Sequence, residues 1–114
     1  MADPPKILAV DDTPTNLEVV VETLSAAGYK VATATNGLRA LKRLETYVPD
    51  LILLDIQMPG MDGFEVCQKL KTSSRTAAIP VIFITAFSDL DNISKGFSLG
   101  AVDYITKPFR DAEL

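Results

Sequence analysis

Short, continuously apolar runs are the feature that most restricts what this chain can fold into. Leu51–Leu54 and Val81–Ile84 hold only aliphatic and aromatic residues, and Lys6–Val10 and Ala101–Ile105 are nearly as apolar. Runs of this length and composition are typical of strands that are covered on both faces. Such strands belong to parallel sheets with helices on each side. A fifth, more polar strand is predicted at Lys30–Thr35, nearer an edge of the sheet.

Helical patterns lie between these strands. The first combines the spacing of one helix face with Pro near its start and Gly just past its end; its residues are Leu17, Val20, Val21 and Leu24, flanked by Pro14 and Gly28. A second helix is marked by Leu38, Leu41 and Leu44.

A third helix opens at Asp62, which is placed as its N-cap, and turns Phe64, Cys67 and Leu70 inward. A fourth is predicted over residues 89–99, before Gly100, and residues 110–114 begin a fifth. Strands and helices therefore alternate along the whole chain. We expect one α/β domain over residues 1–114, with a doubly wound, flavodoxin-like parallel sheet of five strands in the order 2-1-3-4-5.

Composition excludes several classes of function. No apolar run approaches the roughly 20 residues needed to span a bilayer, and the first residues do not resemble a signal peptide, so we expect a cytoplasmic protein without a membrane segment. The formal charge of -4 and the lack of Lys/Arg runs argue against nucleic-acid binding. The chain has no histidine, which excludes His-based acid–base chemistry and most zinc sites. Its single cysteine, Cys67, is expected to be a packed, inert thiol.

Polar side chains follow the predicted strands at their carboxyl ends, where doubly wound sheets bind ligands. The strands are followed by Asp11 and Asp12, by Asp55, by Thr85 and, two residues on, by Lys107. Strands 1 and 3 are neighbours in the expected order. The sequence therefore predicts three carboxylates in one crevice, with a hydroxyl and an ammonium beside them.

Three carboxylates at one edge of a sheet require compensation. Two like charges 4 Å apart repel by about 4 kcal/mol at an effective dielectric constant of 20. Protonation of a carboxylate or a hard cation would offset this, and an all-oxygen site without His or Cys suits Mg²⁺ or Mn²⁺. Alternatively, Asp11–Pro14 only caps the first helix. Asp55 weakens that alternative, because it follows a separate strand.

The residues at the strand ends resemble the signature of bacterial response-regulator receiver domains. They are Val10–Asp12, Leu54–Gly63, Thr85–Ala86 and Lys107–Phe109. The resemblance covers essentially the whole chain in the right order and spacing. It implies that Asp55 accepts a phosphoryl group from a histidine kinase or a phosphotransfer protein.

The resemblance also implies how the other site residues act. Asp12, Asp55 and the backbone carbonyl of Gln57 would bind Mg²⁺ directly, and Asp11 would bind it through water. Two further residues would hold phosphoryl oxygens, Thr85 by a hydrogen bond and Lys107 by its charge.

The resemblance places a conformational switch next to this site. Tyr104 would turn inward when Thr85 moves toward the phosphoryl group. The predicted helix over residues 89–99 contains Gly, Asn and Ser, which are poor helix formers. We expect this helix and strand 5 to form the face that changes on phosphorylation.

The family's last helix runs beyond Leu114, so the sequence predicts a truncated last helix. Either the chain is cut there, or a longer protein continues into an output module. Apolar surface left uncovered by the short helix predicts a tendency to self-associate.

Three other functions compete with a receiver. An aspartate-nucleophile phosphohydrolase would carry a second Asp two residues after its nucleophile, but Thr13 and Gln57 stand at the corresponding places. A flavodoxin-like FMN binder needs hydroxyls and amides where Asp11 and Asp12 stand, and carboxylates would repel the phosphate. A phosphorylation-independent interaction module of the same fold is disfavoured by Asp55 and Lys107.

Overall fold

Eight elements make up the part of the chain that the computed structural model describes, which is residues 4–56, 58, 60–86 and 103–107. For residues 85–86 and 103–107 the description covers the backbone alone. In chain order the elements are β1 (Lys6–Val10), α1 (Pro14–Ala26), β2 (Lys30–Ala34), α2 (Gly37–Arg43), β3 (Leu51–Asp55), α3 (Gly63–Thr72), β4 (Val81–Ala86) and β5 (Asp103–Lys107). The helices predicted over residues 89–99 and 110–114, including the truncated last helix, lie outside the described residues.

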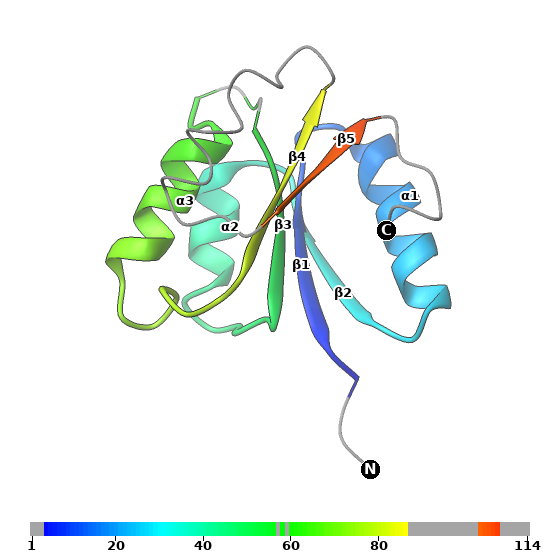
Figure 1. Cartoon of the computed structure of the whole chain (residues 1–114), viewed down its shortest axis with the longest axis horizontal. Coiled ribbons are helices and arrows are strands. Elements are labelled where there is room, and N and C mark those ends of the chain that lie inside the picture. Colours follow the sequence, from blue (N-terminus) through cyan, green and yellow to red (C-terminus); the bar gives the residue numbers. More distant parts are fainter. Residues whose placement is uncertain (1–3, 57, 59, 87–102, 108–114) are drawn as a thin grey trace.

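The strands form one parallel sheet in the order β2-β1-β3-β4-β5, which confirms the predicted topology (Figure 1). Strand β1 pairs with β2 on one side and with β3 on the other, and β3 continues to β4. Strand β2, the most polar of the predicted strands, lies at an edge of the sheet, where a polar strand keeps contact with water.

Helices cover both faces of this sheet, with α2 and α3 on one face and α1 on the other (Figure 1). The first face holds the larger buried cluster, which includes Leu8, Leu54, Phe64 and Phe83; the Phe64 and Phe83 rings meet edge to face with centroids 5.3 Å apart. The face under α1 is smaller and uses Leu17, Val20 and Leu24. Strands β1 and β3 are buried along nearly their full length because both faces are covered.

The third helix and its cysteine, Cys67, agree with their prediction. Asp62 is the N-cap of α3, and its side chain accepts the Glu65 N–H at 2.9 Å. Phe64, Cys67 and Leu70 are buried, as predicted. Burial raises the pKa of the Cys67 thiol, although Lys71 acts in the opposite direction. The expected packed thiol is therefore confirmed.

The second helix differs from its prediction. Leu44 is buried and Leu41 is partly buried, but Leu38 is 69% exposed. Residues spaced by three drift about 60° around a helix at each step, so three of them cannot share a narrow face. The helix instead turns Gly37 and Ala40 toward the core.

Two strands extend further than the sequence suggests. Thr85 lies within β4, and Lys107 is the last residue of β5, whereas both were expected beyond the strand ends. The reason is that β4 and β5 remain paired up to Ala86 and Lys107. Asp55 likewise ends β3 and lies opposite Ile84 in β4.

Candidate functional site

Three carboxylates meet at the carboxyl end of the sheet, as predicted. Asp11 follows β1 directly, Asp55 is the last residue of β3, and these two strands are neighbours. Each of Asp11, Asp12 and Asp55 offers an oxygen, and the three oxygens lie within 4.8 Å of one another. Asp11 and Asp55 are 1% and 2% exposed, whereas Asp12 is open to solvent.

The donor set of this cluster fits a hard divalent cation. All three side chains supply carboxylate oxygens, and neither His nor Cys belongs to the group. Two of the three are buried, where like charges repel more strongly than in water. Oxygen ligands at this separation, with Asp12 on the solvent side, match the preference of Mg²⁺ for a few carboxylates and retained waters.

Asp11 is oriented by the chain that follows it. Its Oδ1 accepts the Thr13 N–H at 2.9 Å, and its Oδ2 accepts the Asn16 side-chain amide at 3.3 Å. Thr13 is the N-cap of α1 and makes no side-chain capping bond. Asp11 therefore anchors the start of α1, which is part of what the capping alternative describes, whereas Asp55 comes from a separate strand and lies outside that alternative. Asn16 was not singled out from the sequence, since nothing local marks a polar helix residue as the partner of a buried acid.

The segment after Asp55 packs tightly onto α3. The Gly63 N–H donates to the Ile56 carbonyl at 2.8 Å. A Cβ on Gly63 would overlap the Asp55 carbonyl oxygen and lie 2.8 Å from the Ile56 Cα. This close approach was not predicted, because the sequence shows a Gly after an N-cap but not the backbone that it faces.

For the other predicted site residues, the structure describes the backbone alone or nothing. Thr85 is one residue past Ile84, the register partner of Asp55, and Lys107 lies opposite Ala86. Both therefore come from the carboxyl ends of β4 and β5. Tyr104 lies deeper along β5, opposite Phe83. Gln57 lies outside the described residues.

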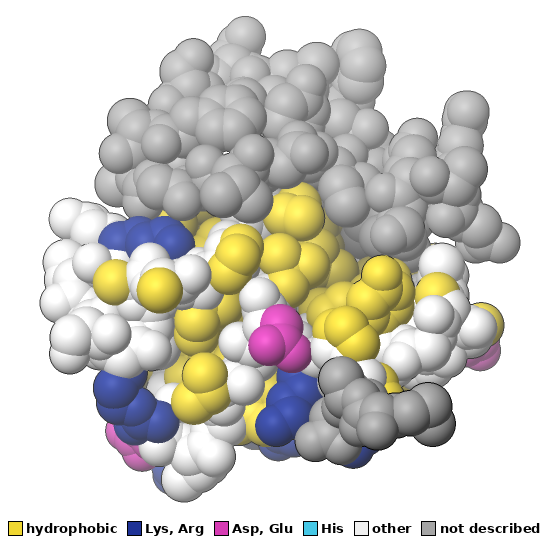
Figure 2. Space-filling view, turned by 60° about the horizontal axis from the view of Figure 1, so that its bottom comes forward, with side chains coloured by type: hydrophobic (Ala, Val, Ile, Leu, Met, Phe, Trp, Pro, Cys, Tyr) yellow, Lys and Arg dark blue, Asp and Glu magenta, His cyan; other side chains and the backbone are white. Residues whose placement is uncertain are grey.

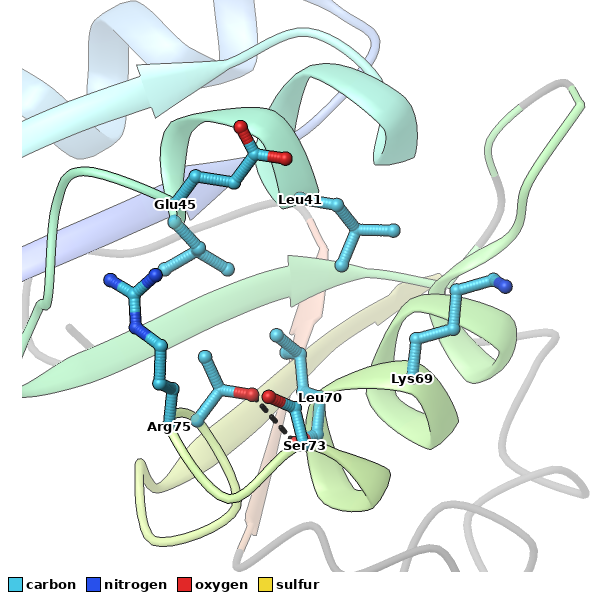
Figure 3. A pocket seen from close by; sticks show the side chains of 8 residues that line it. Leu41, Glu45, Lys69, Leu70, Ser73 and Arg75 are labelled. Carbon is cyan, nitrogen blue, oxygen red and sulfur yellow. Dashed lines mark hydrogen bonds between the residues drawn. The ribbon is translucent and has the colours of Figure 1, made fainter.

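The amino end of the sheet is built differently. A hollow of about 130 Å³ lies between the C-terminal ends of α2 and α3. In Figure 3, Leu41 and Leu70 point toward it, with Glu45 and Arg75 at one side and Lys69 at the other. Figure 2, in which this end comes forward, shows apolar side chains with Lys and Arg among them. Nothing in this arrangement suggests a reaction.

Comparison with known proteins points to one family. The model of the response regulator receiver domain matches residues 7–114. The DNA-binding transcriptional regulator RpaA of Synechocystis is 43% identical over 110 residues, which are 96% of this chain and 46% of RpaA. The chain spans less than half of the length of the curated relatives that it matches first.

Solved structures agree with the sequence matches. The chemotaxis protein CheY4 of Vibrio cholerae superposes with a TM-score of 0.91 at 33% identity, covering 96% of this chain and 92% of CheY4. The receiver domain of a Pseudomonas aeruginosa sensor histidine kinase, with a magnesium ion coordinated in its active-site cleft, gives a TM-score of 0.86 at 30% identity, covering 96% and 90%. Within the described part of the present chain, no helix is long and apolar enough to cross a membrane.

Proposed function

The chain belongs to the response-regulator receiver family, and from this premise we propose that Asp55 accepts a phosphoryl group in a reaction that requires Mg²⁺. One observation carries the proposal: Asp11, Asp12 and Asp55 bring carboxylate oxygens within 4.8 Å of one another at the carboxyl end of the sheet. Asp55 is the one of the three that lies within a strand: it ends the central strand β3, where its register partner is Ile84 in β4.

The acidic cluster would hold the metal ion. Asp12 and Asp55, together with the Gln57 carbonyl, are proposed to bind Mg²⁺ directly, and Asp11 to bind it through water. The hydrogen bonds that Asp11 accepts from Thr13 and Asn16 support this indirect role, because they already engage both of its oxygens. When bound, Mg²⁺ supplies positive charge that offsets the carboxylates and the phosphoryl oxygens.

The proposed reaction is an in-line transfer. An Asp55 oxygen forms a bond to phosphorus as the bond from phosphorus to the donor's histidine nitrogen breaks, and that nitrogen keeps the electron pair. Such transfer depends on positioning and charge neutralisation more than on acid–base help. Thr85 would donate a hydrogen bond to one phosphoryl oxygen, and Lys107 would neutralise another. In this sense the chain would assist its own phosphorylation and dephosphorylation.

The partners follow from the same proposal. The donor would be a histidine kinase or a phosphotransfer protein, and the reaction would take place in the cytoplasm. We propose that Tyr104 and the face formed by residues 89–99 and β5 pass the signal on, either to an output module of a longer protein or to a separate partner. Strand β5 pairs with β4, which in turn pairs with the strand that ends in Asp55.

Labelling with a small phosphodonor tests the proposal. Acetyl phosphate with Mg²⁺ should add one phosphoryl group to the parent chain, as measured by intact mass. Asp55→Asn and removal of Mg²⁺ with EDTA should each abolish the adduct. Asp50→Asn is a matched control at an exposed position, where the Asp50 side chain accepts the Lys6 N–H at 2.8 Å, and it should be labelled normally. Undiminished labelling of Asp55→Asn would overturn the assignment, and an unlabelled parent would favour the phosphorylation-independent module.

A further inference from the structure

We propose that Gly63 is a positioning residue for Asp55: the missing side chain at Gly63 sets where the Asp55 carboxylate lies. This inference rests on the proposed function, because it concerns the residue that would accept the phosphoryl group. It assigns a role in the reaction to the first residue of α3, which carries no reactive group.

The contact is between backbones. A Cβ on Gly63 would overlap the Asp55 carbonyl oxygen and would lie 2.8 Å from the Ile56 Cα and 3.0 Å from the Asp55 carbonyl carbon. Real Cβ atoms essentially never approach other atoms so closely, so any side chain here forces a movement. The atoms in the way belong to the peptide unit that leads directly out of Asp55, and no flexible side chain stands between them.

Further contacts hold both partners in place, so neither can move without disturbing its neighbours. On one side, Asp55 ends a strand that is paired with β1 and β4, and the Ile56 N–H donates to the Ile84 carbonyl at 3.1 Å. On the other side, Phe64 packs edge to face on Phe83, and the inner face of α3 is buried along the helix. The helix is also tied to the strand end, because the Gly63 N–H donates to the Ile56 carbonyl.

Crowding at Gly63 would therefore reach the acidic cluster. The Asp55–Ile56 peptide unit is much smaller than helix α3, so we expect the peptide unit to move rather than the helix. This movement displaces the Asp55 side chain relative to Asp11 and Asp12. One oxygen from each carboxylate lies within 4.8 Å of the other two, so a shift of several tenths of an ångström changes the geometry that a metal ion would meet. A misplacement of about 1 Å is enough to cost about 100-fold in rate.

Gly37 offers a matched control within the same molecule. It is the first residue of α2, as Gly63 is of α3, and each follows an N-cap whose side chain accepts the N–H of the residue three positions on. A Cβ on Gly37 would also be crowded, at 2.7 Å from Val66 Cγ2 and 3.1 Å from Met61 Cβ. Those atoms belong to the side chains of Val66, within α3, and of Met61, two residues before α3, and none belongs to the Asp55 peptide.

The experiment compares Gly63→Ala with Gly37→Ala. Both variants should melt below the parent, although Ala is the better helix former at such a position, because both are crowded. Gly63→Ala should be phosphorylated by acetyl phosphate about 10- to 100-fold more slowly and should bind Mg²⁺ more weakly by calorimetry. Gly37→Ala should stay within about threefold of the parent in both measurements. A merely structural role would lower the melting temperature of both variants and leave Mg²⁺ affinity unchanged.

Equal phosphorylation rates and Mg²⁺ affinities for the two variants would overturn the inference alone. A parent chain that is not labelled and does not bind Mg²⁺ would overturn the proposed function and the inference with it. A measurement on the parent stands even if Gly63→Ala does not fold: in amide NMR spectra, Mg²⁺ should shift the Gly63 and Ile56 signals strongly and the Gly37 signal little. A Gly63 signal that responds no more than Gly37 would contradict the positioning role.

Discussion

The two ends of the sheet treat polar groups in opposite ways. At the amino end, buried and half-buried polar groups are matched one by one with backbone partners: Lys71 donates to the carbonyls of Ala77 and Ile79 at 3.1 and 2.8 Å, and the Thr76 hydroxyl donates to the Leu70 carbonyl at 2.7 Å. At the carboxyl end, three side chains of the same charge are brought together instead.

This difference assigns separate roles to the two ends: the amino end stabilises the fold, and the carboxyl end carries the proposed function. A polar side chain that hydrogen-bonds a buried backbone group stabilises the fold, because leaving that backbone group without a hydrogen bond costs about 1–3 kcal/mol. A group of like charges costs stability unless an ion joins it. Changes at the amino end should therefore alter stability and leave phosphorylation intact, whereas changes at the carboxyl end should alter the response to Mg²⁺.

The largest effect on stability is expected at Lys71. Lys71→Met keeps the apolar stem but removes an ammonium that joins two carbonyls of the loop between α3 and β4. The free energy of unfolding should fall by about 3 kcal/mol, since hydrogen bonds to charged groups contribute about 1.5–3 kcal/mol each. Denaturant titration would measure this, and phosphorylation of Asp55 should stay normal in folded protein.

Lys69→Met is the control for this substitution. Lys69 lies two residues earlier in α3 and is exposed, so its replacement should change stability by no more than about 0.5 kcal/mol. Equal losses for the two variants would mean that the loop does not depend on the Lys71 ammonium, and that the amino end is not held as described.

The sequence indicates the carboxyl end better than the amino end. Asp11, Asp12 and Asp55 could be brought together in advance because strand order alone decides which strand ends are neighbours. Lys71 could not, because its partners are carbonyls of an irregular loop six and eight residues away, and a lysine near the end of a helix is usually solvated. The close approach of Gly63 to Asp55 was not predicted for the same reason, because the neighbour of Gly63 is a backbone that tertiary packing brings near.

A second effect, of similar size, should be seen with Mg²⁺. At a free concentration 100 times its dissociation constant, an ion that binds only the folded state stabilises it by about 2.7 kcal/mol. In calorimetric melting, Mg²⁺ should raise the melting temperature of the parent clearly and that of Asp12→Ala much less. Without metal, Asp12→Ala should melt no lower than the parent, because it removes a like charge from the cluster.

Glu22→Ala controls for the loss of one acidic side chain. Glu22 is exposed on α1, outside the cluster, and its variant should keep the full response to Mg²⁺. A parent melting temperature that does not change at many millimolar Mg²⁺ would contradict the metal site, and with it the contrast between the two ends.

The smallest effect concerns two threonines, one at the C-terminal end of α3 and one in the loop that follows it. Thr76 is 8% exposed and its hydroxyl donates to the Leu70 carbonyl, while Thr72 is exposed and donates to the Lys69 carbonyl at 2.9 Å. Thr76→Val should lower the free energy of unfolding by about 1 kcal/mol, because water reaches the freed Leu70 carbonyl poorly. Thr72→Val should change it by less than about 0.5 kcal/mol, since water replaces its hydroxyl. The Leu70 carbonyl also accepts the Ser73 N–H at 3.3 Å, which keeps the expected loss small. If denaturant titration gave the two variants equal stability, burial of the hydroxyl would not be what stabilises this end of the sheet.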